Sequence, residues 1–180
     1  VLEEAGWTDS DGDGIREKDG QKLTVRWLTY PSRQELPLLA ESAQSTLKDI
    51  GMDVQINATA DHNTIVKDTS AWDVYVGANV NCGLGDPTNF FSTHCLDASI
   101  KNRGQYHSDK MEELAVQLNS TFDKTERNQI AIEMQQQLLD DNAFVFCSFL
   151  KMSMISQANV TGLTAHASDY YELTADLDIN

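Results

Sequence analysis

Basic residues, cysteines and prolines are scarce in this 180-residue sequence, which has 13 lysines and arginines, three cysteines and three prolines. Because 28 aspartates and glutamates oppose the basic residues, the net charge is −15. Nucleic-acid binding needs clustered lysine and arginine that displace counterions, so we expect no nucleic-acid partner. No apolar run approaches the roughly 20 residues that span a bilayer. Hydrophobic residues still make up 41%, which is typical of a globular domain.

The three cysteines do not indicate a disulfide framework, because their number is odd. Cys82 and Cys95 flank a loop-like segment, and whether they form a disulfide stays open at this point. Cys147 lies inside the apolar run AFVFCSFL. We expect it to be a small buried hydrophobic residue, which is how a free cysteine usually behaves.

An acidic stretch, DSDGDGIREKDG, occupies residues 9–20. Aspartates at alternate positions followed by glycine are the first half of an EF-hand loop. An EF-hand needs a bidentate glutamate at loop position 12, which is Gly20 here, and a strand pattern follows in place of a helix. The stretch is therefore either a metal-free turn, which we favour, or a calcium site of another kind. The ligands of that calcium site would be Asp9, Asp11, Asp13, the carbonyl of Ile15, and Glu17 or Asp19.

The first half of the chain alternates between strand and helix patterns. The opening VLEEAGW resembles the last turns of a helix, so we expect the chain to be part of a longer one. The elements expected next are a strand at 21–30, a helix at 35–51, a strand at 52–58, a short helix at 61–70 and a strand at 72–80. This order is typical of an α/β layer with parallel strand pairing.

The second half contains two amphipathic helices, expected at 109–122 and 126–141. Ser108 can cap the first, and Asp123 or Thr125 the second. The residues expected on their buried faces are Met111, Leu114, Ala115, Leu118, Ile130, Met134 and Leu138. Apolar patterns predict strands at 143–150 and 151–156, and a polar tail with a short strand-like centre covers 166–180.

The irregular segment 80–107 is the candidate for ligand binding. It follows the third strand, at the carboxyl end of the sheet, where open α/β folds bind ligands. Asp86 is also the residue expected to start a helix, because Pro87 follows it. The candidate ligand-binding residues of this segment and its edge are Asn79, Asn81, Asp86, Asn89, His94 and Arg103.

Catalytic motifs do not accompany this segment. The sequence contains no G-x-S-x-G turn, no H-E-x-x-H pair and no phosphate-binding glycine loop, so we do not expect an enzyme. The remaining histidines, His62, His107 and His166, are isolated, and we expect them to be surface or capping residues.

Six motifs occur in an order that resembles one known family. They are EEAGW with DSDGDGI, STLKDIGMDVQI, WDVYV, GDPTNFF, TERNQIAIEMQQQLLDDNAF and DYYELTADL. Over nearly all of the chain they resemble the C-terminal half of extracellular solute-binding proteins of the oligopeptide, dipeptide and nickel class, family 5, which serve ABC importers. The resemblance implies an α/β, periplasmic-binding-protein-like type II fold whose two lobes close on a ligand. Residues 1–180 would form a single domain, the C-terminal lobe, and residues 144–180 would pack on the first lobe.

The resemblance also bears on the ligand. Peptide receptors of the class usually carry an aspartate at the place of Gly83, and nickel receptors usually carry a tryptophan and a tyrosine at the places of Asn81 and Gly85. This sequence departs from both patterns. The closing stretch HASDYYELTADLD is more similar to the nickel branch, and that branch uses a histidine in about the region of His94.

Two function classes follow from these observations. The first is a monomeric extracytoplasmic receptor, in the periplasm or lipid-anchored, which captures a peptide or a nickel or other metal chelate and works with ABC permease subunits without a required cofactor. The second is a free-standing acidic calcium-binding module that uses residues 9–20.

Overall fold

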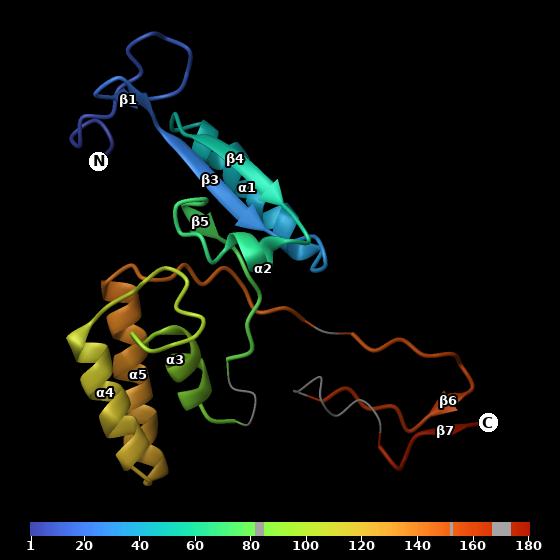
Figure 1. Ribbon diagram of the computed structural model, residues 1–180. Coiled ribbons are helices and arrows are strands. Elements are labelled where there is room, and N and C mark those ends of the chain that lie inside the picture. The colour runs from blue at the N-terminus through green and yellow to red at the C-terminus, as the bar shows by residue number, and fades with distance from the viewer. Residues whose placement is uncertain (82–84, 152, 167–173) are drawn as a thin grey trace.

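A three-stranded parallel sheet forms the first half of the protein in this computed structural model, which describes residues 1–81, 85–151, 153–166 and 174–180 (Figure 1). The central strand is β3 (Thr24–Thr29), between β4 (Asp53–Ala58) and β5 (Val74–Tyr75). α1 (Glu35–Lys48) connects β3 to β4, and the short α2 (His62–Ile65) precedes β5. The predicted parallel α/β layer is therefore confirmed, although α2 and β5 are shorter than expected.

The sheet packs on α1 through apolar side chains that the alternation predicted. Leu28 and Val54 of the strands and Leu36 and Ala40 of the helix are all buried. Gly51 ends the helical segment with a φ of +85°, and a Cβ atom there would lie 2.7 Å from the Arg16 side chain. The position therefore requires glycine both for its backbone conformation and for the close approach of Arg16.

The opening of the chain is held against this layer. Residues 1–7 form a hydrogen-bonded turn, and no helix is assigned there as the sequence had suggested. β1 (Glu17–Lys18) and β2 (Gln21–Lys22) then form a short antiparallel hairpin, which was not predicted. Its turn residues Asp19 and Gly20 both have positive φ, as the hairpin geometry requires.

Three helices form the second half of the protein. They are α3 (Thr88–His94), α4 (Asp109–Ser120) and α5 (Lys124–Asp140). The Ser108 hydroxyl caps α4, and the Asp123 carboxylate caps α5 by accepting from two backbone N–H groups. The predicted caps and inward faces are confirmed, with Ile130 only partly buried. The core that the three helices enclose consists of Phe90, Phe91, Cys95, Met111, Leu114, Ala115, Leu118, Ala131, Met134 and Leu138.

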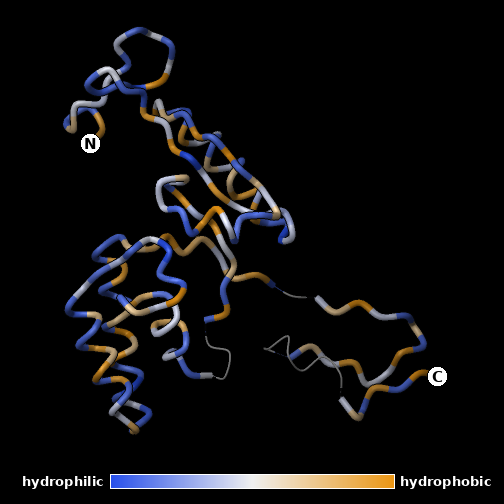
Figure 2. Tube along the Cα trace, viewed as in Figure 1, coloured by the Kyte–Doolittle hydropathy of each residue, from blue (hydrophilic) through white to orange (hydrophobic). Residues whose placement is uncertain are grey.

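The predicted strands at 143–150 and 151–156 are wrong for the described residues of those segments, to which no helix or strand is assigned. Cys147 is exposed, so its predicted burial is also wrong, whereas Cys95 is a buried free thiol. Figure 2 shows apolar residues recurring along this part of the trace, and the rings of Phe144 and Phe146 contact Phe90 of α3. An apolar pattern indicates that a segment will be buried, but it does not say against what.

The chain ends in β6 (Val160–Thr161) and β7 (Asp178–Ile179), which pair antiparallel. The strand-like centre predicted for the tail falls largely at 167–173, outside the described residues, as do Gly83 and Cys82. None of the described helices combines the length and hydropathy that crossing a membrane requires.

Candidate functional site

The carboxyl ends of β3, β4 and β5 meet at one edge of the sheet. The Thr59 N–H donates to the Thr29 carbonyl at 3.0 Å, and the Val76 N–H donates to the Leu28 carbonyl, also at 3.0 Å. The Thr29 hydroxyl, fully buried, donates to the Val76 carbonyl. These bonds fix the residues that directly follow β3, β4 and β5. We call this end of the sheet, with those residues, the carboxyl edge.

An aromatic stack covers the carboxyl edge. The rings of Tyr30 and His62 lie parallel with centroids 4.1 Å apart, and Tyr75 lies 6.4 Å from His62. His62 is half-buried, and its Nδ1 atom is buried without a hydrogen-bond partner among the described residues. The expectation of a surface or capping residue therefore misses the role of His62 in this stack.

The stack also holds the chain that leaves β5. The Ala78 N–H donates to the Tyr30 hydroxyl at 3.1 Å. A Cβ atom on Gly77 would lie 3.1 Å from the Tyr75 ring, so a larger residue there would require the ring to shift by a few tenths of an ångström. The stack thus helps to set the direction in which the chain leaves the sheet toward the three helices.

Two predicted site residues meet just beyond this crossing. The Nε2 atom of His94 lies 3.0 Å from the Asn79 side-chain oxygen, and its Nδ1 atom lies 3.3 Å from the Phe90 carbonyl. The His94 ring stacks on Phe90 and is only 7% exposed. Both ring nitrogens therefore already have partners within the chain.

The pKa of His94 is lowered from its ordinary value, mainly by burial. The charges of Lys101 and Arg103 also lower it, and the hydrogen bond to the Phe90 carbonyl partly opposes them. The carbonyl can only accept, so a neutral ring keeps its proton on Nδ1. Nε2 then accepts from the Asn79 amide, whereas a protonated ring donates to the amide oxygen. The Asn79 amide can bond to either protonation state of His94, because a 180° rotation of the amide exchanges its oxygen and its NH₂ group.

His94 and His107 should titrate on opposite sides of pH 6.5, the ordinary value for histidine. The Asp97 carboxylate raises the pKa of His107, whose ring lies 2.9 Å from it. His94 thus contributes stability above pH 6.5 that is lost as the pH falls through its folded pKa, and His107 contributes stability that is lost as the pH rises. NMR titration of the two rings tests this expectation, and a His94 pKa above that of His107 would contradict it.

Asp86 serves the helices rather than an open site. Its carboxylate accepts from the Thr88 N–H at 2.8 Å, which confirms its predicted place at the start of a helix. Its other oxygen accepts from Arg127 at 2.7 Å. The Asn89 side chain accepts from Thr93 one turn along α3.

The remaining predicted residues differ in exposure. Asn79 is exposed, and Asn81 and Arg103 are half-buried. Of the six predicted ligand residues, the structure therefore brings together Asn79 and His94, with the charge of Arg103 acting on His94.

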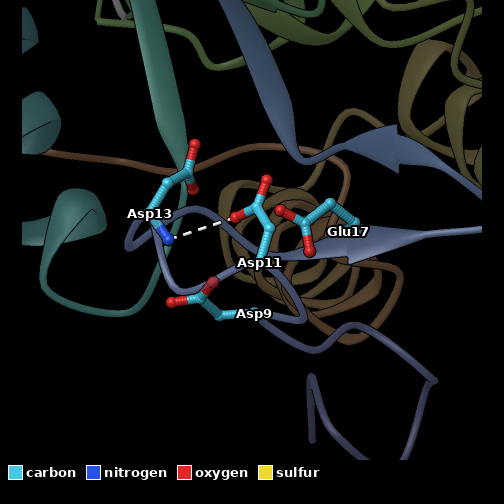
Figure 3. A group of neighbouring side chains, drawn as sticks. All are labelled: Asp9, Asp11, Asp13 and Glu17. Atoms are coloured by element: carbon cyan, nitrogen blue, oxygen red, sulfur yellow. Dashed lines mark hydrogen bonds between the residues drawn. The ribbon is translucent and has the colours of Figure 1, made fainter.

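The acidic loop gathers the carboxylates of Asp9, Asp11, Asp13 and Glu17, with one oxygen from each within 4.8 Å of the others (Figure 3). Backbone N–H groups of the loop donate to all four of them; Gly12, for example, donates to Asp9 at 2.8 Å. The Lys22 ammonium forms an ion pair with Asp13 and lies 3.8 Å from Asp11. The negative charge of the loop is thus partly balanced by the chain itself.

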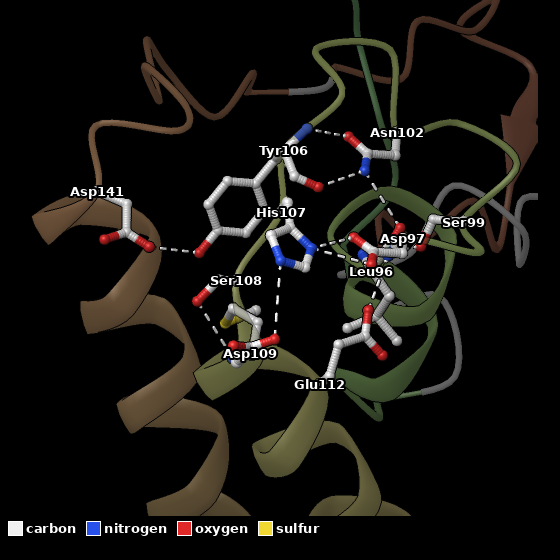
Figure 4. A network of polar contacts seen from close by, with 11 residues as sticks. Leu96, Asp97, Ser99, Asn102, Tyr106, His107, Ser108, Asp109, Glu112 and Asp141 are labelled. Atoms are coloured by element: carbon white, nitrogen blue, oxygen red, sulfur yellow. Dashed lines mark hydrogen bonds and ion pairs between the residues drawn. The ribbon is translucent and has the colours of Figure 1, made fainter.

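A polar network fixes the segment between α3 and α4 (Figure 4). The Asn102 amide donates to the carbonyls of Leu96 and Tyr106, and its oxygen accepts from the Tyr106 N–H at 2.9 Å. The Tyr106 hydroxyl donates to Asp141 at 2.6 Å, and burial is the main cause that raises the pKa of Tyr106 to about 12. Arg103 therefore directly follows Asn102, whose side chain is held by these three hydrogen bonds.

Residues 1–102 match the bacterial extracellular solute-binding proteins, family 5 (middle part). The chain belongs to this family. Its fold is accordingly of the periplasmic-binding-protein-like type II class, as the sequence predicted. Members of family 5 are binding proteins rather than enzymes.

Relatives of this family 5 chain are named as nickel-binding or oligopeptide-binding proteins. It is 31% identical over 118 residues to the nickel-binding protein NikA of Staphylococcus aureus, covering 63% of the chain and 24% of the relative. It is 24% identical to the oligopeptide-binding protein AppA of Bacillus subtilis, covering 96% of the chain and 32% of AppA. The structure of a nickel ABC transporter protein from Bacillus halodurans superposes with a TM-score of 0.74 at 26% identity, over 99% of the chain and 37% of that protein.

The chain thus spans about a quarter to a third of the length of the curated relatives it matches. A further relative, from Escherichia coli, is named as a nickel-binding periplasmic protein.

Proposed function

We propose that this chain is the C-terminal lobe of a receptor that captures a peptide or a nickel or other metal chelate outside the membrane for an ABC importer. The observation that carries the proposal is the carboxyl edge, where the aromatic stack and the Asn79–His94 contact converge. Ligands of open α/β folds bind at this end of parallel strands. Binding there would favour the closed arrangement of two lobes, with no chemical step and no required cofactor.

Exposed apolar side chains at 145–151 and 153–155 support the proposed two-lobed architecture. Val145 is 88% exposed, Phe149 83% and Ile155 94%. Leaving such side chains in water forgoes about 1.5–3 kcal/mol each compared with full burial. We infer that residues 144–180 pack against the first lobe, and that the complete receptor is a monomer that meets permease subunits.

Native mass spectrometry of the gently purified gene product that carries this chain tests the receptor function. We expect a bound small molecule, or uptake of added trialanine or of nickel(II) with L-histidine. The isolated 1–180 chain should bind the same probes more weakly, because it supplies one wall of the site. Failure of the gene product to take up either probe, with no co-purified ligand, would contradict the function.

The second candidate function, calcium binding by the acidic loop, is favoured by the convergence of four carboxylates. Backbone donors and Lys22 already satisfy much of their charge, so we expect a metal-free turn in the native chain. Calcium should then leave the melting temperature almost unchanged, and the Asp11→Ala variant should respond as the native chain does.

Replacing Lys22 by Met should create a calcium response in this loop. The substitution removes the ammonium from Asp11 and Asp13, so a divalent cation no longer competes with it. At calcium concentrations above the dissociation constant the melting temperature should rise. Differential scanning fluorimetry measures the change, with Lys67→Met as the control at an exposed lysine away from the loop. A native chain that already responds to micromolar calcium, and loses that response in Asp11→Ala, would show that the loop is a calcium site.

A further inference from the structure

Aspartate directly precedes glycine at three places in the sequence: Asp11–Gly12, Asp13–Gly14 and Asp19–Gly20. The glycine amide nitrogen of such a pair can attack the side-chain carboxyl carbon of the aspartate, because glycine has no Cβ atom to hinder the approach. All six residues are exposed, so access to water does not distinguish the three pairs. The hydrogen bonds that the pairs make do distinguish them.

The Asp9 carboxylate holds the glycine N–H groups of the first two pairs, and Figure 3 shows it beside Asp11 and Asp13. The Gly12 N–H donates to one Asp9 oxygen at 2.8 Å, and the Gly14 N–H donates to the other at 3.0 Å. Each nitrogen must give up its hydrogen bond before it can attack a neighbouring carboxyl group. Asp9 therefore protects both pairs.

The carboxylates that would be attacked in these two pairs are held as well. Asp11 accepts from the Asp13 N–H at 3.1 Å. Asp13 accepts from the Ile15 N–H at 2.9 Å and forms an ion pair with Lys22. A carboxyl group with these partners cannot turn toward the next amide nitrogen without losing them, which adds to the barrier for both pairs.

The third pair, Asp19–Gly20, lacks both restraints. It forms the two-residue turn between β1 and β2. In the part of the chain that the structure describes, the Gly20 N–H makes no hydrogen bond, and the Asp19 carboxylate makes neither a hydrogen bond nor an ion pair. Attack requires the turn to leave its φ values of +53° and +77°. Each strand of the hairpin has two residues and is largely exposed, so local opening costs little free energy.

We propose that Asp19 is a site of spontaneous isoaspartate formation, and that Asp9 protects Asp11 and Asp13 from the same reaction. The Gly20 nitrogen bonds to the Asp19 Cγ atom, and the carboxyl hydroxyl leaves with the amide proton as water, which closes a five-membered succinimide ring. Water then adds to one ring carbonyl. Breaking the bond from nitrogen to the main-chain carbonyl gives isoaspartate, and breaking the bond to Cγ restores aspartate. One water is lost and one is taken up, and nothing is oxidised or reduced.

The isoaspartate product would change the β1–β2 hairpin, because the chain then runs through the Asp19 side chain and the turn is longer by one methylene group. The register that pairs Glu17 with Lys22 and Lys18 with Gln21 depends on a two-residue turn. Lys22 is also the ion-pair partner of the acidic loop, so the modification should reach that loop. This inference is independent of the proposed receptor function.

Incubation of the gene product in neutral buffer made with oxygen-18 water tests the proposal, because each passage through the succinimide inserts one solvent oxygen. Trypsin, used afterwards in ordinary water, cleaves after Arg16, Lys18 and Lys22 and so separates Asp19–Gly20 from the other two pairs. Mass spectrometry with fragment-ion analysis then locates the label. Asp19–Gly20 should be labelled about 2- to 10-fold faster than either other pair, the factor that one hydrogen bond of ordinary net strength makes in a rate. In concentrated urea this difference should disappear.

Three variants complete the test. Asp9→Ala should speed labelling of the first two pairs about 2- to 10-fold, because it frees both glycine N–H groups. Ser10→Ala is the matched control in the same loop, since the Ser10 hydroxyl donates to Glu17. Asp19→Glu should reduce labelling of residues 19–22 to background, because attack would have to close a six-membered ring.

Equal labelling of the three pairs in the folded protein would overturn the proposal. Unchanged labelling of the first two pairs in Asp9→Ala would overturn the protective role of Asp9. Label that persists at residues 19–22 in Asp19→Glu would show that it does not enter through a succinimide at Asp19.

Discussion

Replacing Met134 by Ala should lower the free energy of unfolding by about 2–5 kcal/mol, the usual cost of truncating a buried methionine. The Met134 side chain is fully buried in the core that α5 shares with α3 and α4. Removing it leaves a cavity among close-packed neighbours, because the three helices are joined through this core and cannot all move inward. Urea unfolding followed by circular dichroism at 222 nm measures the loss.

Ile132→Ala is the matched control for this prediction. Ile132 lies two residues earlier on α5 and is 57% exposed, so its truncation should cost less than about 1 kcal/mol. Equal losses in the two variants would mean that α5 does not pack through the face that carries Met134.

Replacing Arg127 by Gln should cost about 2–4 kcal/mol of stability, because it breaks charge-assisted hydrogen bonds at a partly buried position. Arg127 donates to the Asp86 carboxylate at 2.7 Å and to the Thr88 hydroxyl at 2.9 Å. Its other nitrogen donates to the Leu118 carbonyl at 2.6 Å and to that of Thr121 at 2.9 Å. One side chain therefore joins the start of α3 to the end of α4, and a neutral amide cannot reproduce this set.

The same substitution should also disturb the candidate site, since α3 carries His94. Loss of the Arg127 anchor should loosen the His94–Asn79 contact and move the His94 pKa toward 6.5. Lys124→Gln, on the same helix and exposed, is the control for the loss of one charge. A stable Arg127→Gln variant with an unchanged His94 pKa would show that Arg127 does not position α3.

The parts of the fold that depend on local pattern were predictable from the sequence. Helices α4 and α5 follow directly from their apolar spacing and from the caps at Ser108 and Asp123. The parallel sheet follows from the alternation of strand and helix patterns. Segment 143–156 was not predictable in the same way, because only its start packs within the described part of the chain. Phe144 and Phe146 contact the Phe90 ring, whereas Val145, Phe149 and Ile155 are exposed.

The position of the candidate site, at the carboxyl end of the sheet, could be predicted from the sequence, but the contacts that its residues make could not. The carboxyl end of the sheet and the residues Asn79, His94 and Arg103 could be chosen because polar groups follow the third strand. Asp86 is instead held by Arg127, which is 41 residues away. The stack of Tyr30 on His62 joins residues 32 apart in the sequence and depends on strand register. A sequence signal did exist, because aromatic residues follow or end two neighbouring strands.

Hydrogen exchange of the gene product, measured with and without trialanine or nickel(II)–L-histidine, tests most directly whether the ligand binds at the carboxyl edge. The account predicts protection in residues 76–81 and 94–106 and in the residues that follow β3 when either probe binds. Protection confined to the acidic loop at 9–20, or bound probe without any change at 76–81 and 94–106, would contradict it.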